Sequence, residues 1–134
     1  MFPSAGILNY DDTDGYRLTV EVDRDLADYY FSLIPKSHKA IRPRYAPHIT
    51  VVRPEKEIPP KVRYWGSYEG EWIVFYYDSN IFCDKGYYWL NVWCKRLEAI
   101  REELGLPIIS RWTLPPSGFS KCFHCTIGKE RHMI

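Results

Sequence analysis

The sequence predicts an α+β protein in which antiparallel sheet and two main helices surround a central cleft. Three observations lead to this class. Apolar residues recur at helical spacing in two segments, and several other runs are rich in β-branched and aromatic residues, as strands are. Each half of the chain also ends in an expected strand that opens with His-x-Thr. A length of 134 residues suits one domain, so we expect a single domain over 1–134 made of two pseudo-symmetric lobes.

The first half of the chain predicts strand, helix, strand. Residues 16–22, "YRLTVEV", alternate between apolar and polar side chains, as a half-buried strand does. The helix that follows has Asp23 as its N-cap, and Pro35 ends it. Residues 48–53, "HITVVR", are rich in β-branched side chains and predict the second strand, which the turn-forming segment 54–60 closes.

The second half repeats this order after an aromatic stretch. The runs 62–70, 71–78 and 86–94 are rich in aromatic and β-branched residues and are separated by turn residues, so we expect a meander of three strands. Segment 94–105 predicts a helix with one apolar face and charges on the other, and Gly105 marks its end.

The remainder of the second half is loop and a final strand. Residues 106–121 contain three prolines and no long periodic run, and they predict an ordered loop with a possible short strand at 107–110. The last strand, 121–127, then carries the second His-x-Thr.

The overall charge excludes one class of partner. Lys and Arg number 18 against 17 Asp and Glu, a net charge of +1, so no global field is present to hold duplex nucleic acid. A nucleotide ligand would have to be small or locally bound. The segment 36–48 does carry several cations and no carboxylate, and it predicts either a solvated loop or an anion-attracting rim.

Nothing in the composition indicates export or a membrane span. The N-terminal residues lack a basic flank with a long apolar segment, and no run reaches the ~18 apolar residues that a membrane helix needs. We therefore expect a soluble cytosolic protein with reduced thiols. Cys122 and Cys125 form a C-x-x-C without a partner pair, which is better explained by strand alternation than by a metal.

Two His-x-Thr pairs, His48 with Thr50 and His124 with Thr126, indicate phosphate chemistry. Residues i and i+2 of a strand point the same way, so each pair presents an imidazole and a hydroxyl to one side. Cleavage of a phosphodiester needs a base, an acid and donors to the non-bridging oxygens. Two histidines can share the proton transfers, and the threonine hydroxyls suit the third task.

The pairs are not accompanied by a carboxylate cluster at metal-ligand spacing, so we expect chemistry without a metal or other cofactor. The natural nucleophile is then a neighbouring 2′-hydroxyl of a ribonucleotide, and DNA should be inert. The chain has only two other histidines, His38 and His132, and we expect both to be structural or surface residues.

The motifs "HIT" at 48–50 and "HCT" at 124–126 resemble those of the two-histidine phosphoesterase superfamily, and the resemblance covers nearly the whole chain. It implies a bilobal fold with a central cleft. The run "YYFSLIPKSHKAIRPRYAPHITVVRPEK" is similar to small phage-encoded members that act as anti-CBASS cyclic oligonucleotide phosphodiesterases.

By that resemblance the substrate is a cyclic di- or trinucleotide signal, such as a cyclic GMP–AMP, cut at a 3′–5′ linkage in the cytoplasm of an infected bacterium. His48 and His124 would be the acid and the base in an order that the sequence leaves open, and the two threonines would bind the phosphate. The residues considered for substrate binding are two aromatic residues that could stack on a base and three cations that could attract the anion: Tyr10, Trp72, Arg42, Arg44 and Lys36.

Three other functions fit the same sequence. One is a two-histidine phosphodiesterase acting on RNA or 2′,5′-oligonucleotides. The second is a binding module, or sponge, that holds a cyclic nucleotide without cutting it. The third is an interaction protein whose aromatic surface is an interface and whose histidines are incidental.

Overall fold

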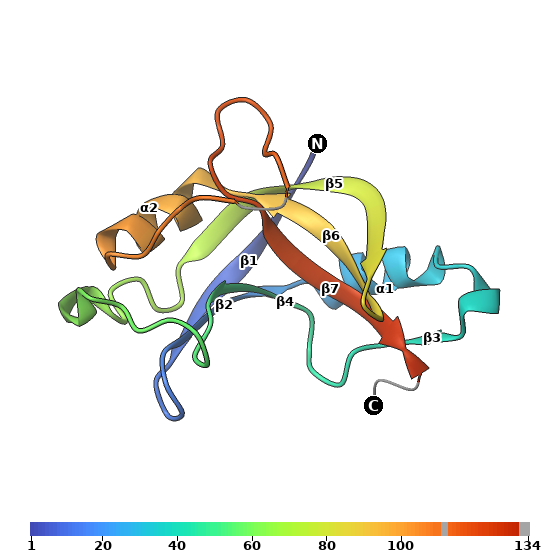
Figure 1. Cartoon of the computed structure of the whole chain (residues 1–134), viewed down its shortest axis with the longest axis horizontal. Coiled ribbons are helices and arrows are strands. Elements are labelled where there is room, and N and C mark those ends of the chain that lie inside the picture. Colours follow the sequence, from blue (N-terminus) through green and yellow to red (C-terminus); the bar gives the residue numbers. More distant parts are fainter. Residues whose placement is uncertain (111–112, 132–134) are drawn as a thin grey trace.

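A computed structural model describes residues 1–110 and 113–131 (Figure 1). Its regular elements, in chain order, are β1 (Phe2–Asp11), β2 (Arg17–Val22), α1 (Arg24–Ser32), η1 (Lys36–His38), β3 (Ala40–Ile41), β4 (His48–Val52), η2 (Val62–Tyr64), β5 (Trp72–Asp84), β6 (Tyr87–Trp93), α2 (Lys95–Glu103) and β7 (Phe123–Glu130); η marks a short 3-10 helix. The protein is therefore α+β, with antiparallel sheet and two main helices, as the sequence predicted.

Six of the strands close into an antiparallel barrel. The order of pairing is β7, β4, β2, β1, β5, β6, and β6 pairs again with β7. The short strand β3 adds to β7 beside β4. Closure leaves alternate side chains pointing into one shared core, so the barrel interior is filled by residues such as Leu8, Val20, Ile49, Phe75, Leu90 and Ile127.

The two halves of the chain have the same order of elements and of pairing. In the first half β1 pairs with β2 and β2 with β4; in the second, β5 pairs with β6 and β6 with β7. Each half thus consists of two strands, a helix and a third strand. The third strands pair with each other, β4 with β7, and the first strands pair with each other, β1 with β5.

Figure 1 shows α1 and α2 at opposite ends of the molecule. Helix α1 begins at Asp23, whose side chain accepts a hydrogen bond from the Asp25 amide, and it buries Ala27 and Tyr30. Helix α2 buries Leu97 and Ile100 as its apolar spacing predicts. It also buries Glu98 and Arg101, because both make hydrogen bonds that replace water.

The N-terminal strand β1 and the segment 62–70 differ from the sequence prediction. Strand β1 was not expected, since Pro3 and Gly6 interrupt its pattern, yet residues 2–7 pair with β5 and residues 6–11 pair with β2. Segment 62–70, expected to be a strand, contains only the short helix η2 and turns. Gly66 and Gly70 both have positive φ there, which breaks an extended chain.

Two smaller expectations complete the comparison. Residues 107–110 contain no regular strand, and His132 lies outside the described residues. Within the described part of the chain, neither main helix has the length and apolar character that a membrane-spanning helix requires.

Candidate functional site

The pairing of β4 with β7 brings the two His-x-Thr pairs together. Ile49 of β4 is the antiparallel partner of Cys125 of β7. The register set by this pair places the flanking residues opposite one another: His48 opposite Thr126, and Thr50 opposite His124. We call these four residues the His/Thr quartet. Opposite Cβ atoms in such a pair are about 5 Å apart and diagonal ones about 7–8 Å, so both imidazoles lie within reach of one phosphate group.

The quartet lies on the outer face of the barrel. Ile49 and Cys125 are buried, because they point into the core. Their neighbours along each strand point the other way: His48, Thr50 and Thr126 are half-buried and His124 is exposed. The alternation expected from the sequence is therefore what separates core from candidate site.

The strands that flank β4 and β7 extend the quartet into two rows of four residues. One row runs across β2, β4, β7 and β6 as Thr19, Thr50, His124 and Asn91. The next row runs across the same strands as Glu21, His48, Thr126 and Trp89. The two rows show that the histidines have different neighbours, with a carboxylate beside His48 and an amide beside His124.

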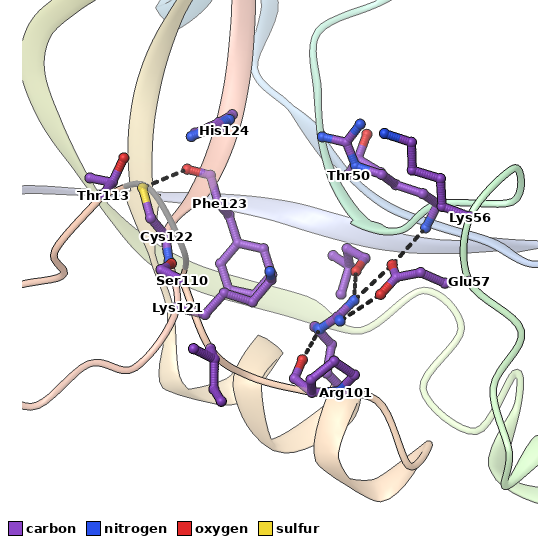
Figure 2. Close-up of a pocket in the computed structure, with 14 residues that line it drawn as sticks. Thr50, Lys56, Glu57, Arg101, Ser110, Thr113, Lys121, Cys122, Phe123 and His124 are labelled. Atoms are coloured by element: carbon purple, nitrogen blue, oxygen red, sulfur yellow. Dashed lines mark hydrogen bonds and ion pairs between the residues drawn. The ribbon is translucent and has the colours of Figure 1, made fainter.

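A cavity of about 420 Å³ adjoins Thr50 and His124 (Figure 2). Four cations line it: Arg53 and Lys56 from the turn after β4, Lys121 from just before β7, and Arg101 from α2. The one carboxylate among its described lining residues, Glu57, is paired with Arg101. The unpaired charges of the lining are therefore positive, which suits an anionic ligand.

Arg101 and Glu57 form the floor of this cavity. The Arg101 guanidinium, 2% exposed, donates to both Glu57 carboxylate oxygens at 3.0 and 2.7 Å (Figure 2). It also donates to the carbonyls of Val51 at 2.7 Å and Pro107 at 2.9 Å. Burial alone would raise the pKa of Glu57, but the bonds from Arg101 to its carboxylate and one from the Arg53 amide hold that pKa below its usual range. The pair ties α2, β4 and the loop after α2 to one another.

A second buried charge fixes the start of β7. The Glu98 carboxylate accepts hydrogen bonds from the amides of Ser120 at 2.9 Å and Lys121 at 3.1 Å. These two amides lie just before the strand that carries His124. Helix α2 therefore positions both the cavity floor and the approach to the second His-x-Thr.

His124 has surroundings that oppose its protonation. Partial burial of the imidazole, and then the positive charges of Arg53 and Lys121, lower the pKa of His124 below its usual 6.5. The ring of Trp89 lies beside the imidazole, with centroids 5.3 Å apart. The neutral form of His124 is therefore the favoured one near neutral pH.

The His48 imidazole is oriented by the loop that precedes β4. Its Nδ1 lies 2.9 Å from the Ala46 carbonyl oxygen, which can only accept, so Nδ1 carries a proton and donates. Two further cavities open beside it. One, about 330 Å³, lies toward Thr126 and is lined by Arg44, Tyr45, Tyr87 and Lys129 among others. The other, about 600 Å³, lies toward Glu21 and β2.

Of the five residues that the sequence suggested for substrate binding, Arg44 is one that lines a cavity with a quartet residue. Arg42 forms an ion pair with Asp28 at 2.9 Å and lines a small cavity that also touches Thr126. Lys36 lies in η1 and borders none of the cavities beside the quartet.

The two suggested stacking residues, Tyr10 and Trp72, lie on other strands. Tyr10, in β1, packs edge-on against Trp65 with centroids 5.0 Å apart, and burial raises its pKa to about 12. Trp72 is exposed on β5, which β6 separates from β7. Neither is among the residues that line the cavities beside the quartet.

Several site residues were not singled out from the sequence. The cations Arg53, Lys121 and Lys129 lie close to the two motifs in the sequence, in "HITVVR" and "KCFHCTIGK". Their nearness to the motifs could be read from the sequence, but not that their side chains line the cavities. Tyr45 and Tyr87 could be found only from the folded chain, because they come from different halves.

The remaining histidines, cysteines and carboxylates do not assemble a metal centre in the described residues. Over 1–110 and 113–131 no three His, Cys, Asp or Glu side chains gather as a metal site requires. His38 contacts the Tyr88 hydroxyl at 3.0 Å, which fits the structural role expected for it. Cys122 and Cys125 are free thiols, and burial raises their pKa values to about 11 and 12.

Fold and site together define an α+β protein whose closed antiparallel barrel carries two histidines and two threonines on one outer face, beside a cationic cavity. Comparison with protein-family models, with curated proteins and with solved structures finds no match to this chain.

Proposed function

We propose that this protein is a metal-independent phosphodiesterase that cleaves the 3′–5′ linkages of cyclic di- or trinucleotides, with His48 and His124 as general acid and base. The observation that carries the proposal is the β4–β7 register, which places the two histidines diagonally across one pair of strands with a threonine beside each. Two side chains that transfer protons and two that donate hydrogen bonds are what cleavage of a phosphodiester needs.

The reaction is a transfer of the phosphoryl group to the neighbouring hydroxyl. One histidine takes the proton from the ribose 2′-hydroxyl as that oxygen bonds to phosphorus. The bond from phosphorus to the 5′-oxygen breaks, and the other histidine gives its proton to that oxygen. The hydroxyls of Thr50 and Thr126 donate to the non-bridging oxygens. Because the 2′-oxygen has replaced the 5′-oxygen on phosphorus, the first product is a 2′,3′-cyclic phosphate.

The charges around the quartet support an anionic substrate of limited size. The cavity beside His124 has three unpaired cations and the one between His48 and Thr126 has Arg44 and Lys129. A net charge of +1 for the whole chain disfavours a long duplex, so the positive field is local. A small molecule with two or three phosphates matches both facts.

The resemblance of the His-x-Thr motifs supports the two-histidine phosphoesterase class, and the repeated order of two strands, helix and strand supports its bilobal plan. On this basis we propose that the protein acts like the small phage anti-CBASS enzymes. It would degrade a cyclic GMP–AMP or cyclic trinucleotide signal in the cytoplasm of an infected bacterium.

The test is incubation of the purified protein, in excess EDTA, with a panel of cyclic di- and trinucleotides and a linear RNA, followed by chromatography of the products. We expect the cyclic compounds to be cleaved, and His48→Ala and His124→Ala each to abolish cleavage. Cleavage of linear RNA alone would move the protein to RNA processing. Tight binding with no turnover would identify a sponge, and loss of activity in EDTA would overturn the metal-independent mechanism.

A further inference from the structure

The two histidines occupy equivalent places in the repeated fold, but their neighbours differ. On the strand next to His48, the paired residue is Glu21. On the strand next to His124, the paired residue is Asn91, which is buried. The two histidines therefore differ in the charge of their cross-strand neighbour, which is a carboxylate for His48 and a neutral amide for His124.

The charges lining the cavities reinforce the difference at His124. Arg53, just after β4, and Lys121, just before β7, lie at the same end of the strand pair and bring positive charge near the His124 imidazole. The carboxylate of Glu57 in the same cavity is already paired with Arg101. Positive neighbours without a free carboxylate favour the neutral ring, which is the form that can accept a proton.

Groups of both signs surround His48. The Ala46 carbonyl accepts from Nδ1, which holds the proton there and leaves Nε2 to exchange protons with a ligand. Glu21 lies across the strand pair, and the cations that line the two cavities are Arg17 and Arg24 on the side of Glu21 and Arg44 and Lys129 on the side of Thr126. At His48, therefore, a carbonyl holds the Nδ1 proton and a carboxylate lies across the strand pair, so Nε2 is the ring atom that faces a ligand.

The cavities on the two sides also differ in the surfaces they offer. The cavity between His48 and Thr126 is lined by Tyr45 and Tyr87, whose side chains are well exposed at 73% and 44%. The cavity beside His124 contains no tyrosine or tryptophan among its described lining residues. Exposed tyrosine rings next to cations are suited to stack on a nucleobase.

From these differences, and resting on the phosphodiesterase function proposed above, we infer a fixed direction of the substrate. His124 takes the proton from the 2′-hydroxyl and His48 gives its proton to the departing 5′-oxygen. The nucleoside that leaves through its 5′-oxygen therefore lies on the His48 side, with its base against Tyr45 and Tyr87. The nucleoside that keeps the phosphate lies on the side of Arg53 and Lys121.

Replacement of the leaving oxygen tests which histidine is the acid. The substrates are 3′,5′-cyclic GMP–AMP and its analogue with sulfur in place of each bridging 5′-oxygen, because a thiolate leaves without protonation. We expect His124→Ala to lower kcat by about 10²–10⁴-fold on both substrates. His48→Ala should lower kcat as much on the oxygen substrate and by less than about tenfold on the sulfur analogue.

The outcomes separate this inference from the proposed function. A sulfur analogue that rescues His124→Ala in place of His48→Ala would reverse the direction, and rescue of neither or of both would overturn the assignment while cleavage itself stands. A wild-type protein that cleaves neither substrate nor any other cyclic nucleotide would remove both proposals. His48→Gln and His124→Gln, with thermal unfolding midpoints for all four variants, guard against a folding defect.

The stacking surface has its own test. Tyr45→Leu should raise KM for the oxygen substrate by about tenfold or more while leaving kcat nearly unchanged. Tyr29→Leu is the matched control, since Tyr29 is also an exposed tyrosine, lies on α1 and borders none of the cavities beside the quartet. Equal KM values for the two variants would overturn the assignment of Tyr45 to the base of the leaving nucleoside.

Discussion

His124 is the residue whose chemistry depends most on its neighbours. Partial burial of its ring, and then the positive charges of Arg53 and Lys121, lower the pKa of His124, so the neutral imidazole, the form that can act as a base, is favoured at a pH where an isolated histidine is half protonated. Burial, and then the charge of Arg101, likewise lowers the pKa of Lys121. Under the proposed function, cations at this position would lower the pKa of the base and attract the anionic substrate at the same time.

The acid limb of the pH profile for kcat/KM reports this adjustment. Because a base must be unprotonated, we predict that the acid limb lies below pH 6.5, the usual pKa of histidine. Removal of a positive neighbour raises the pKa of His124, so Lys121→Met should move the limb to higher pH. Lys61→Met makes the same change of charge away from the described cavities beside the quartet and should leave the limb in place. A limb that moves downward in Lys121→Met would contradict this role.

Thr50 tests the proposed contact with the non-bridging oxygens. Thr50→Val keeps the shape of the side chain and removes only the hydroxyl donor. If that donor stabilises charge in the transition state, kcat should fall by about 10²-fold with little change in KM. Steady-state kinetics decide this, and a rise in KM at constant kcat would assign Thr50 to ground-state binding instead.

At the scale of elements, α2 contributes as much to the site as the two strands that carry the motifs. Its apolar spacing predicted the helix correctly, and its charges were placed only on the opposite face, with no partners assigned to them. Glu98 and Arg101 are buried, since they satisfy amides and carbonyls of the loop after α2 and of β4. Local sequence could not reveal this, because the partners of both residues lie far away along the chain.

The ion pair between Arg101 and Glu57 should be worth much more than those at the surface. Arg101→Met leaves the Glu57 carboxylate without its partner, so we predict a loss of about 3–5 kcal/mol in the free energy of unfolding. Arg96→Met is the control, because its pair with Glu71 is exposed on both sides and should cost less than about 1 kcal/mol. Urea unfolding measures the stability of both variants. Similar losses of free energy would show that the buried ion pair of Arg101 stabilises the protein no more than a surface pair does.

The elements that the sequence did predict are those whose pattern is local. Strands β2, β4, β5, β6 and β7 and both main helices follow from their alternation or helical spacing. Strand β1 was missed because its extended conformation is stabilised by pairing with β2 and β5, which lie on either side of it, and not by a local sequence pattern. The aromatic residues of 62–70 suggested a strand, but Trp65 instead packs edge-on against Tyr10 and Tyr16. The four motif residues were found by spacing, whereas the register that joins them depends on the whole barrel.

At the scale of the whole molecule, closure of the barrel makes the two halves depend on each other. The pairing of β1 with β5 and of β4 with β7 joins them on both sides of one core. The quartet is built where the two halves meet, so neither half carries a complete site. Folding and function should therefore be lost together.

Unfolding should accordingly be a single transition. All five tryptophans lie after residue 61, whereas Leu8 is fully buried in β1. We predict that Leu8→Ala lowers the free energy of unfolding by about 3 kcal/mol and shifts the tryptophan fluorescence and far-UV circular dichroism transitions together. Separate midpoints for the two signals would show that the halves unfold independently.

The most direct test of attack by the neighbouring hydroxyl is to remove that hydroxyl. In excess EDTA, we predict that 3′,5′-cyclic GMP–AMP yields a 2′,3′-cyclic phosphate as the first product detected by phosphorus NMR. The analogue with 2′-deoxyribose at both positions should not be cleaved. Cleavage of the deoxy analogue at a similar rate would mean that water is the nucleophile, and it would contradict attack by the neighbouring 2′-hydroxyl.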